Sequence, residues 1–438
     1  MRPFYRVSLL TRQVGSALRQ DQSRIFKLIS RAEALKRTFA SMKERRLEHE
    51  TVAADELCGR VLAEDVTAPH DVPSRNRAAM DGYAVRSQDT VGASTSSPVR
   101  LTITGKRFPA DRAGGKIAKA ECVYTSTGAP LPSGSDAVAQ VENTRLVGSA
   151  IEVLRPLAPH ENVSIKGEDV KQGETVFKRG HQVPPQGIGM LLGLGIRSVK
   201  VVRKPRASII SVGDELVDAY GETQHRVVND HAYIVRELLR QLGAEPKILG
   251  VVPDNPELIK ARISEALPDS DIVITIAGSS VGTKDFVPDV VASLGKTVFH
   301  GILVTPGKVT GVGIIDGKPV IMLPGYLMSA LAGFYFFVVP LVNFLGSEST
   351  NWLPVVEAKL EKTARAKHGL ERFQLLQLSK RGNSYVATTV EGQLAGRLSL
   401  NKVNAYTIIP KGQVLKKGKH VAATLLSPSE FRRIQTET

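Results

Sequence analysis

Four short loops of this chain carry residue types that could do chemistry on a ligand. Each follows an apolar run and combines glycine or proline with acidic side chains or a lysine: GDEL at 213–216, PDNP at 253–256, AGSSVGTKD at 277–285 and TPGKV at 305–309. In a parallel sheet, ligands bind beyond the carboxyl ends of the strands. We therefore expect a ligand site where these loops meet.

The elements that must position these loops follow from the pattern after Arg206. Strand-like runs occur at 207–213, 246–252, 271–278 and 297–304, and helical patterns occur between them at 228–244, 256–267 and 288–295. Strands that alternate with helices of this length predict βαβ units and a mostly parallel sheet.

The segments on either side of this α/β pattern are rich in short strands. Residues 62–205 alternate short apolar runs with glycine, proline and serine, apart from a turn and short helix expected at 181–196, and residues 351–438 return to short strands. Short apolar runs separated by turn-forming residues are typical of β-rich modules. We expect one such module before the α/β region and a small β-domain after it.

Two helical segments leave a membrane role open. Residues 24–42 form a basic amphipathic pattern, which fits either a membrane-surface helix or an ordinary solvated helix, and we favour the second. Residues 326–347 hold no charged side chain and are long enough to span a bilayer. Pro340 and Asn343 interrupt this run, so we predict a buried core helix and no membrane span.

Composition and charge narrow the class of protein. The 438 residues carry 58 Lys and Arg against 43 Asp and Glu, and this excess of +15 first suggests nucleic acid. The excess of positive charge lies at the two ends of the chain, however. Residues 1–50 hold 12 basic and 5 acidic residues, and residues 351–438 hold 15 basic and 6 acidic residues. Residues 51–350 hold 31 basic and 32 acidic residues and are nearly neutral. Two cysteines exclude a disulfide scaffold and fit a reducing compartment. We predict a cytoplasmic protein.

The most specific string is PSRNRAAMDGYAVRSQD at 73–89. It resembles the signature of the molybdopterin molybdenumtransferase family, which includes the molybdenum-insertion proteins and the gephyrin E domain. Five further matches follow in the family's order: STGAPLPSGSDAV at 126–138, KGEDVKQGE at 166–174, SVGDEL at 211–216, GSSVGTKD at 278–285 and TPGK…LPG at 305–325.

The resemblance implies an elongated multidomain homodimer of α/β and β-rich domains, with a three-layer α/β/α molybdopterin-binding domain and a C-terminal β-barrel-like domain. On this basis the chain divides as follows: a basic leader at 1–22, an extended N-terminal domain at 23–72 and 160–205, a β-rich insert at 73–159, the α/β/α domain at 206–347 and the C-terminal β-domain at 348–438.

The implied activity is insertion of molybdate or tungstate into adenylylated molybdopterin, with release of AMP. Hydrolysis of a phosphoanhydride requires a cation such as Mg²⁺, carboxylates that hold it, and N–H donors from glycine-rich loops. Further implied partners are molybdate and the adenylyltransferase of the same pathway.

The family's functional residues carry over to matching positions of this sequence. Asp81, Glu215, Asp254 and Asp285 would be catalytic, and the last three would also hold the metal. Asp81, Thr127 and Asp169 would approach the cleft from the partner subunit, and Lys308 would meet an anion. The implied substrate-binding residues are Thr127, Asp169, Gly213, Asp214, Gly278, Ser280, Gly282, Pro306, Gly307, Lys308, Pro324 and Gly325.

Each polar residue of this set also has a structural interpretation. Asp81, Thr127 and Asp169 could bond local turns, Glu215 could pair with a surface arginine, and Lys308 could be solvated. Asp254 could cap the helix at 256–267, and Asp285 could cap the helix that follows it. The cysteines and histidines show no ligand spacing, so we interpret them as structural.

Several loops depart from the family's pattern. Thr283 replaces an acidic residue, Val309 follows TPGK where the family has proline, and Tyr326 and Leu327 replace Asn and Pro of PGNPVS. The basic GRxxFxR stretch reads GLERFQLL at 369–376, which retains Arg372. These changes leave open a catalytically weakened molybdopterin-binding paralogue or scaffold. A basic nucleic-acid-binding protein is a further alternative, although no recognisable nucleic-acid module is present.

Overall fold

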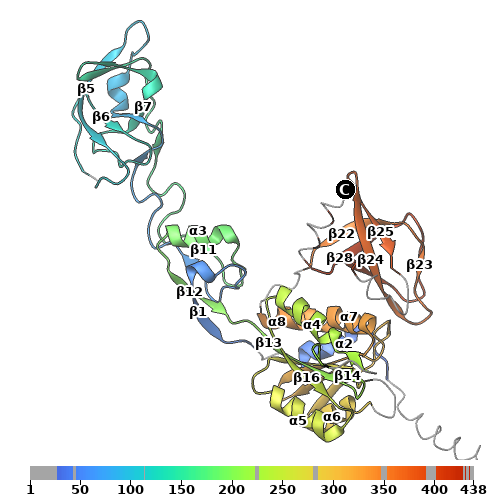
Figure 1. The fold of residues 1–438 in the computed structure, drawn as a ribbon. Coiled ribbons are helices and arrows are strands. Elements are labelled where there is room, and N and C mark those ends of the chain that lie inside the picture. The colour runs from blue at the N-terminus through green and yellow to red at the C-terminus, as the bar shows by residue number, and fades with distance from the viewer. Residues whose placement is uncertain are drawn as a thin grey trace, which may run out of the picture. The chain divides into compact units, whose positions relative to one another are not determined.

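The computed structural model describes residues 27–42, 46–112, 114–221, 226–279, 285–346, 353–390 and 401–427, with Glu430 and Ile434. The leader expected at 1–22 and the site residues Ser280 and Gly282 lie outside these ranges, as does Thr283. The chain forms two compact units (Figure 1): the first joins residues up to His49 with Val202 onward, and the second is Glu50–Val201.

A six-stranded mixed sheet forms the centre of the first unit. The strand order is β16-β13-β17-β21-β20-β18. The strands are β13 (Arg206–Val212), β16 (Glu245–Val252), β17 (Ile272–Ile276), β18 (Lys296–His300), β20 (Gly311–Ile315) and β21 (Lys318–Leu323). The first four in this order are parallel, whereas β20 pairs antiparallel with both β21 and β18. β18 therefore runs in the same direction as the first four strands, only β20 is reversed, and the predicted mostly parallel sheet is confirmed.

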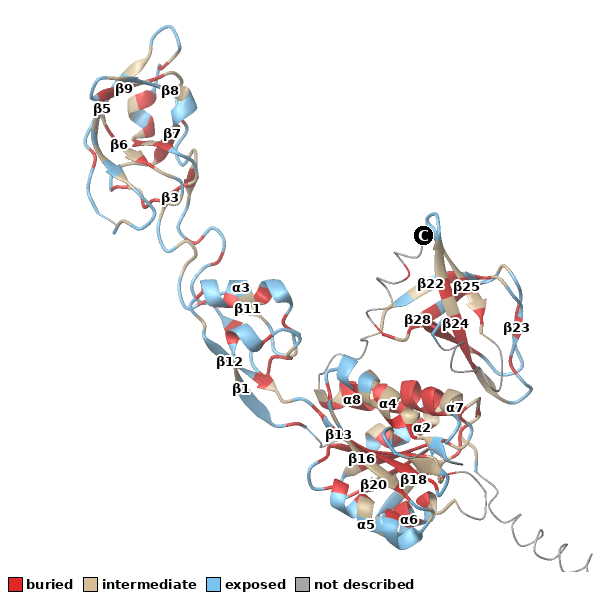
Figure 2. Ribbon diagram, viewed as in Figure 1, coloured by how far each residue is buried: buried red, intermediate tan, exposed pale blue. Residues whose placement is uncertain are grey.

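Helices cover both faces of this sheet. One face carries α2 (Arg31–Ala40), α4 (Asp230–Gln241), α7 (Leu327–Gly333) and α8 (Val339–Gly346), and the other carries α5 (Pro256–Ala266) and α6 (Val287–Leu294) (Figure 1). Side chains alternate across a strand, so Ile209 packs into the core under α4 and Ile210 into the core under α5. Figure 2 shows the buried sheet between helices whose outer faces are exposed. This is the expected three-layer domain.

The uncharged segment forms a mostly buried helix over Leu327–Gly346, as predicted. α7 and α8 are joined by one π-helical turn, η5 (Phe334–Val338), all of whose residues are buried. Residues Leu327–Gly346 are long and apolar enough to cross a membrane, but 72% of the most apolar stretch is buried within the protein. Its aromatic rings explain the burial: Tyr335 lies 5.2 Å from Tyr406 between ring centroids, and its hydroxyl donates to the Leu426 carbonyl at 3.0 Å.

The C-terminal strands close into the expected barrel. β24 (Glu371–Arg381), β25 (Ser384–Thr389), β22 (Val355–Leu360), β28 (His420–Leu425) and β26 (Ala405–Ile409) pair in this order, and β26 pairs back to β24. β23 (Ala364–Arg365) pairs separately with β27 (Val414–Leu415). β19 (Val304–Thr305) pairs with the barrel strand β24, so a short stretch of the α/β domain extends the barrel sheet.

The second unit contains a separate six-stranded sheet with the order β7-β4-β6-β5-β9-β8. Its strands are β4 (Gly82–Val85), β5 (Val99–Arg107), β6 (Glu121–Thr125), β7 (Ala137–Gln140), β8 (Thr144–Val147) and β9 (Ala150–Val153). A short pair, β3 (Arg77–Ala78) with β10 (Val163–Ser164), lies beside the signature at 73–89.

The rest of the second unit has its own small core. β1 (His49–Ala53) pairs with β12 (Ser198–Val202), and β2 (Val66–Thr67) pairs with β11 (Thr175–Phe177). Helix α3 (Pro185–Gly193), expected at 181–196, places Leu191 in the core that these strands share.

Two element predictions need correction. Residues 24–26 of the helix expected at 24–42 lie outside the described ranges, and helix α2 begins at Arg31, where Ser30 caps it by accepting a hydrogen bond from the Glu33 N–H at 3.2 Å. Its buried Ala34 and Thr38 pack on the core, so it is an ordinary helix of the folded domain. The strand expected at 297–304 divides into β18 and β19, because β18 ends at His300 and pairs in the α/β sheet, whereas β19 pairs with the barrel.

Candidate functional site

A large cleft opens at the carboxyl ends of the parallel strands in the first unit. Its volume is about 1400 Å³, and it is lined by the loops after β13, β16, β17 and β21 and by residues of the C-terminal barrel. The four chemically suggestive loops therefore meet, as the parallel pattern predicted. Ten of the proposed site residues line this cleft: Gly213, Glu215, Asp254, Gly278, Asp285, Pro306, Gly307, Lys308, Pro324 and Gly325.

The loop after β13 carries Glu215, whose exposed carboxylate lies close to the backbone of Gly213. Gly213 has φ +157°, and a Cβ there would lie 2.7 Å from a carboxylate oxygen of Glu215. The backbone carbonyl of Glu215 accepts from the Val227 N–H at 2.8 Å. The positive φ at 213 favours glycine, whereas the contact with the flexible end of Glu215 could be relieved by a small movement of that side chain.

The loops after β13 and β16 bind each other through a reciprocal pair of aspartates. The Asp254 N–H donates to Oδ1 of Asp214 at 3.1 Å, and the Asp214 N–H donates to Oδ2 of Asp254 at 3.4 Å. The cap of α5 is Asn255, whose Oδ1 accepts from the Glu257 and Leu258 N–H groups, so Asp254 is not the helix cap. Asp214 holds Asp254 in place but does not itself line the cleft.

The loop after β17 turns sharply at Ala277 and Gly278. Both have positive φ, +68° and +64°, and a Cβ at Gly278 would meet Val212 and Val287 at 2.9 Å. This close packing brings the end of β17 onto the start of α6. The N-cap residue of α6 is Phe286, which gives no side-chain cap, and Asp285 just before it faces the cleft.

Lys308 lies in the loop before β20. The Gly307 carbonyl accepts from the hydroxyl of buried Thr310 at 2.8 Å, and the Lys308 carbonyl accepts from the Ile302 N–H at 2.8 Å. The backbone is therefore fixed while the exposed side chain of Lys308 remains at the cleft.

The prediction missed Asn229, which lines the cleft and is 3% exposed. Its Oδ1 accepts from the Ser211 hydroxyl at 2.7 Å, but its buried Nδ2 has no hydrogen-bond partner. A buried donor without a partner costs about 1–3 kcal/mol, so an acceptor from a ligand would satisfy it. The neighbours Asp230 and His231 line the same wall, and all three stand where the resembled family has Asp-Ser/Thr-Asn.

The barrel contributes a basic wall that sequence reasoning only partly anticipated. Arg365, Lys367 and Arg372 line the cleft. The Nη1 of Arg372 donates to the Arg365 carbonyl at 3.1 Å, which ties β24 to β23. Arg372 was anticipated, whereas Arg365 and Lys367 fall outside the family stretch and carried no recognisable signal.

The acidic residues fit a hard cation by their chemistry but do not form a closed cage. Carboxylate oxygens are donors that Mg²⁺ accepts, and Mg²⁺ usually takes one or two of them with water and substrate phosphate. Within the described ranges, no three His, Cys, Asp or Glu side chains lie close enough together to hold a metal ion. Glu215, Asp254 and Asp285 thus remain a predicted metal set that would be completed by the substrate.

The remaining predicted residues belong to the second unit. Asp81 Oδ1 accepts from the Thr127 N–H at 2.6 Å and from its hydroxyl at 2.9 Å, and these bonds lower the pKa of Asp81 below its ordinary value. Asp169 is exposed, and its N–H donates to the Val72 carbonyl at 3.1 Å. Asp81 and Thr127 thus bond each other across 46 residues of the chain rather than their own local turns, and neither lines the cleft of the first unit.

Fold and cleft together define a class of protein: a multidomain chain with an α/β/α ligand-binding domain whose cleft combines carboxylates with basic side chains. Residues 29–195 match the MoeA N-terminal region (domain I and II), and residues 208–343 match the family described as "Probable molybdopterin binding domain".

Similar proteins cover most of the chain. A protein of Methanocaldococcus jannaschii assigned to molybdopterin biosynthesis is 37% identical over 65% of this chain and 71% of its own length. The molybdopterin molybdenumtransferase of Staphylococcus aureus (strain COL) is 28% identical over 87% of this chain and 91% of its own length. The crystal structure of a molybdopterin biosynthesis MoeA protein from Pyrococcus horikoshii is 32% identical, with a TM-score of 0.80, and covers 92% of this chain and 100% of its own. The chain belongs to the MoeA family of molybdopterin molybdenumtransferases.

Proposed function

We propose that this chain is a molybdopterin molybdenumtransferase that acts in molybdenum cofactor biosynthesis. Its substrates would be adenylylated molybdopterin and molybdate or tungstate, and its products would be the metal-bearing cofactor and AMP. The observation that carries the proposal is the cleft itself, where acidic loops at the sheet edge face Lys308 and the basic barrel wall. A cleft with one acidic side and one basic side suits an anionic substrate. Its basic side would bind the substrate's negative charge, and its acidic side would hold the cation that hydrolysis of a phosphoanhydride needs.

The basic side of the cleft would bind the substrate's negative charge. Lys308, Arg365 and Lys367 are exposed side chains that line it, so they can reach an anion without breaking an internal contact of the core. Arginine forks suit phosphate and other tetrahedral oxyanions. The unsatisfied Nδ2 of Asn229 would donate to an acceptor of the same ligand.

The acidic side would hold Mg²⁺ through Glu215, Asp254 and Asp285. When bound, this ion would supply charge neutralisation at the phosphoanhydride. Asp254 is held by its reciprocal bonds with Asp214. This carboxylate would therefore need little reorganisation on binding.

We further propose a homodimer, which gives Asp81, Thr127 and Asp169 a role at the cleft. They lie in the second unit and carry the family's motifs, so in a dimer the partner's copies would complete the cleft. We further propose that the protein works in the cytoplasm and receives its substrate from the adenylyltransferase of the pathway.

The experiment incubates purified protein with adenylylated molybdopterin, molybdate and Mg²⁺, and measures AMP release and reconstitution of a molybdenum enzyme. Glu215→Gln removes one charge while keeping the shape, and we expect AMP release to fall by about 10²-fold or more. Asp218→Asn, outside the cleft lining, is the matched control. Absence of both AMP and active cofactor with the unaltered protein refutes the catalytic proposal.

A second candidate, a protein that binds molybdopterin without turning it over, is favoured by the altered Tyr326. The same experiment separates the two candidates, because the binding protein would retain molybdopterin but release no AMP.

A further inference from the structure

We propose that the second unit holds a separate binding site for a phosphate-bearing small molecule, formed by Arg75, Arg77 and Arg112. The site is a cavity of about 420 Å³ that none of the molybdenumtransferase residues described above lines. Its lining residues are Arg75, Arg77, Pro109, Asp111, Arg112 and Pro130. Arg75 and Arg77 belong to the signature at 73–89, but the cavity shares no lining residue with the cleft of the first unit.

The charge around this cavity is not balanced. Three arginines and one aspartate line it, and the aspartate carboxylate is engaged elsewhere, because Oδ2 of Asp111 accepts from the Phe108 N–H at 2.8 Å. Within the part of the chain that the structure describes, no ion pair is formed by Arg75, Arg77 or Arg112. Like charges that gather without a counter-ion repel each other, so an anion would stabilise this arrangement.

Arg77 supplies a second and separate observation. Its Nε is buried and has no hydrogen-bond partner, and its Nη1 has only a long bond of 3.4 Å to the Gly128 carbonyl. Buried polar atoms without a partner are rare in folded proteins and often mark the place of an ion or water. The unsatisfied donor of Arg77 therefore indicates an acceptor in the cavity.

The backbone that carries Arg77 is firmly held. The Ala78 N–H donates to the Ala129 carbonyl at 3.0 Å, and the Gly128 N–H donates to the Ala78 carbonyl at 2.7 Å. β3 is also paired with β10 on its other edge. Arg77 is thus presented to the cavity by a rigid support, as a binding residue should be.

The chemistry of the side chains identifies the class of ligand. A guanidinium offers parallel N–H donors that match two oxygens of a phosphate. Three such groups around one cavity exceed what a single carboxylate ligand needs, and the cavity is larger than one phosphate ion. A diphosphate or a phosphorylated metabolite fits both the charge and the space.

The test is isothermal titration calorimetry of the full-length protein with inorganic pyrophosphate, and separately with molybdate. Cleft binding is removed in a background that carries Lys308→Ala and Arg365→Ala. In this background we expect one pyrophosphate to bind per chain, with an affinity that falls as salt rises. Arg112→Gln and Arg75→Gln should each weaken it by about 10-fold.

Arg100→Gln is the matched control, because Arg100 is an exposed arginine on β5 of the same unit that does not line the cavity. It should leave the affinity unchanged, and Arg112→Lys should lie between the unaltered and glutamine forms. Far-UV circular dichroism and the melting midpoint check that every variant is folded.

The proposal is overturned if pyrophosphate does not bind in this background, or if Arg112→Gln and Arg100→Gln bind it equally. Tight binding of molybdate with no binding of pyrophosphate would also overturn it, since the site would then serve the metal oxyanion.

Discussion

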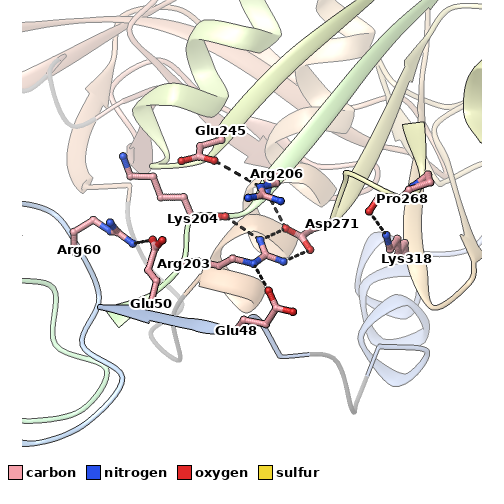
Figure 3. Close-up of polar contacts among 10 residues, drawn as sticks. All are labelled: Glu48, Glu50, Arg60, Arg203, Lys204, Arg206, Glu245, Pro268, Asp271 and Lys318. Atoms are coloured by element: carbon pink, nitrogen blue, oxygen red, sulfur yellow. Dashed lines mark hydrogen bonds and ion pairs between the residues drawn. The ribbon is translucent and has the colours of Figure 1, made fainter. Parts of the chain in front are cut away.

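Arg203 and Asp271 form a two-bond ion pair at the edge of the α/β domain (Figure 3). Nη1 of Arg203 lies 2.6 Å from Oδ2 of Asp271, and Nη2 lies 2.9 Å from Oδ1. The Arg206 N–H donates to the same Oδ2 at 2.9 Å, so both carboxylate oxygens are engaged. Only 4% of the Asp271 side chain is exposed. Arg203 also contacts Glu48 at 3.2 Å, so it ties together the two segments by which the chain leaves and re-enters the first unit.

Asp271→Asn should destabilise the protein by about 3 kcal/mol. Removal of one partner leaves the other charge largely buried without compensation, and such losses are much larger than those of exposed pairs. The free energy of unfolding from urea denaturation measures the effect. Glu48→Gln is the control, because the Glu48 side chain is 85% exposed and its loss should cost about 1 kcal/mol or less. Equal effects of the two substitutions would contradict this account.

The α/β core was predictable because its signals are local. Continuous apolar runs such as β17 and the amphipathic pattern of α4 each follow from a short window of sequence. The hairpin of β20 and β21 was missed, since its pairing depends on contacts with the rest of the sheet rather than on a periodic pattern. The short β19 was merged with β18 for the same reason: its partner, Glu371–Arg372, lies far along the chain.

The candidate site was predictable where a motif carried it and not elsewhere. Glu215 and Lys308 lie in strings that resemble the family's motifs, and both line the cleft. Arg365 and Lys367 look like ordinary surface residues in the sequence, and only the closed barrel brings them to the cleft. The role of Asn229 depends on an unsatisfied atom, which no sequence pattern reveals.

Thr127→Val should raise the pKa of Asp81 toward its ordinary value. The substitution removes the hydroxyl donor at 2.9 Å but keeps the backbone donor at 2.6 Å, so part of the lowering remains. Hydrogen bonds to the carboxylate favour its charged form. A carboxyl group with a lowered pKa stabilises the fold above its unfolded pKa, and this contribution is lost as the pH falls through the folded pKa. As the pH falls, the Thr127→Val variant should therefore lose this contribution to stability at a higher pH than the unaltered protein.

Carbon-13 NMR titration of the Asp81 carboxyl measures this shift. Thr90→Val, whose hydroxyl bonds elsewhere in the same unit, is the control and should leave the Asp81 titration in place. A lower pKa of Asp81 in Thr127→Val would refute the assignment of these bonds.

Arg365→Gln and Lys367→Gln should each raise KM for the anionic substrate by about 10-fold while changing kcat less. A charge-assisted hydrogen bond contributes about 1.5–3 kcal/mol, and binding residues affect KM when they act equally in the ground and transition states. Steady-state AMP release at several salt concentrations measures both constants. Lys359→Gln on β22 is the control, as it lies outside the cleft lining. A fall in kcat alone would indicate a catalytic role instead.

Only one of the two cysteines should react in the native protein. Cys58 is exposed, whereas Cys122 is buried within β6 and its burial raises the pKa of the thiol to about 12. Because the thiolate is the reactive form, a thiol reagent should label one site per chain at neutral pH and two sites in urea. Mass spectrometry of the labelled peptides identifies the site. Native labelling of Cys122 would show that the β-rich sheet opens more readily than its packing indicates.

Tyr326→Ala should weaken molybdopterin binding by about 10-fold. Tyr326 is the N-cap residue of α7, lines the cleft beside Pro324 and Gly325, and is 73% exposed, so its ring is accessible to a ligand in the cleft. A flat pterin could stack on such a ring, and stacking of this kind contributes about 1–3 kcal/mol. Tyr326→Phe keeps the ring and should bind normally. Tyr220→Ala is the control, since Tyr220 is 98% exposed and does not line the cleft. Fluorescence titration with molybdopterin measures the affinity, and equal binding by Tyr326→Ala and Tyr326→Phe would exclude stacking at this position.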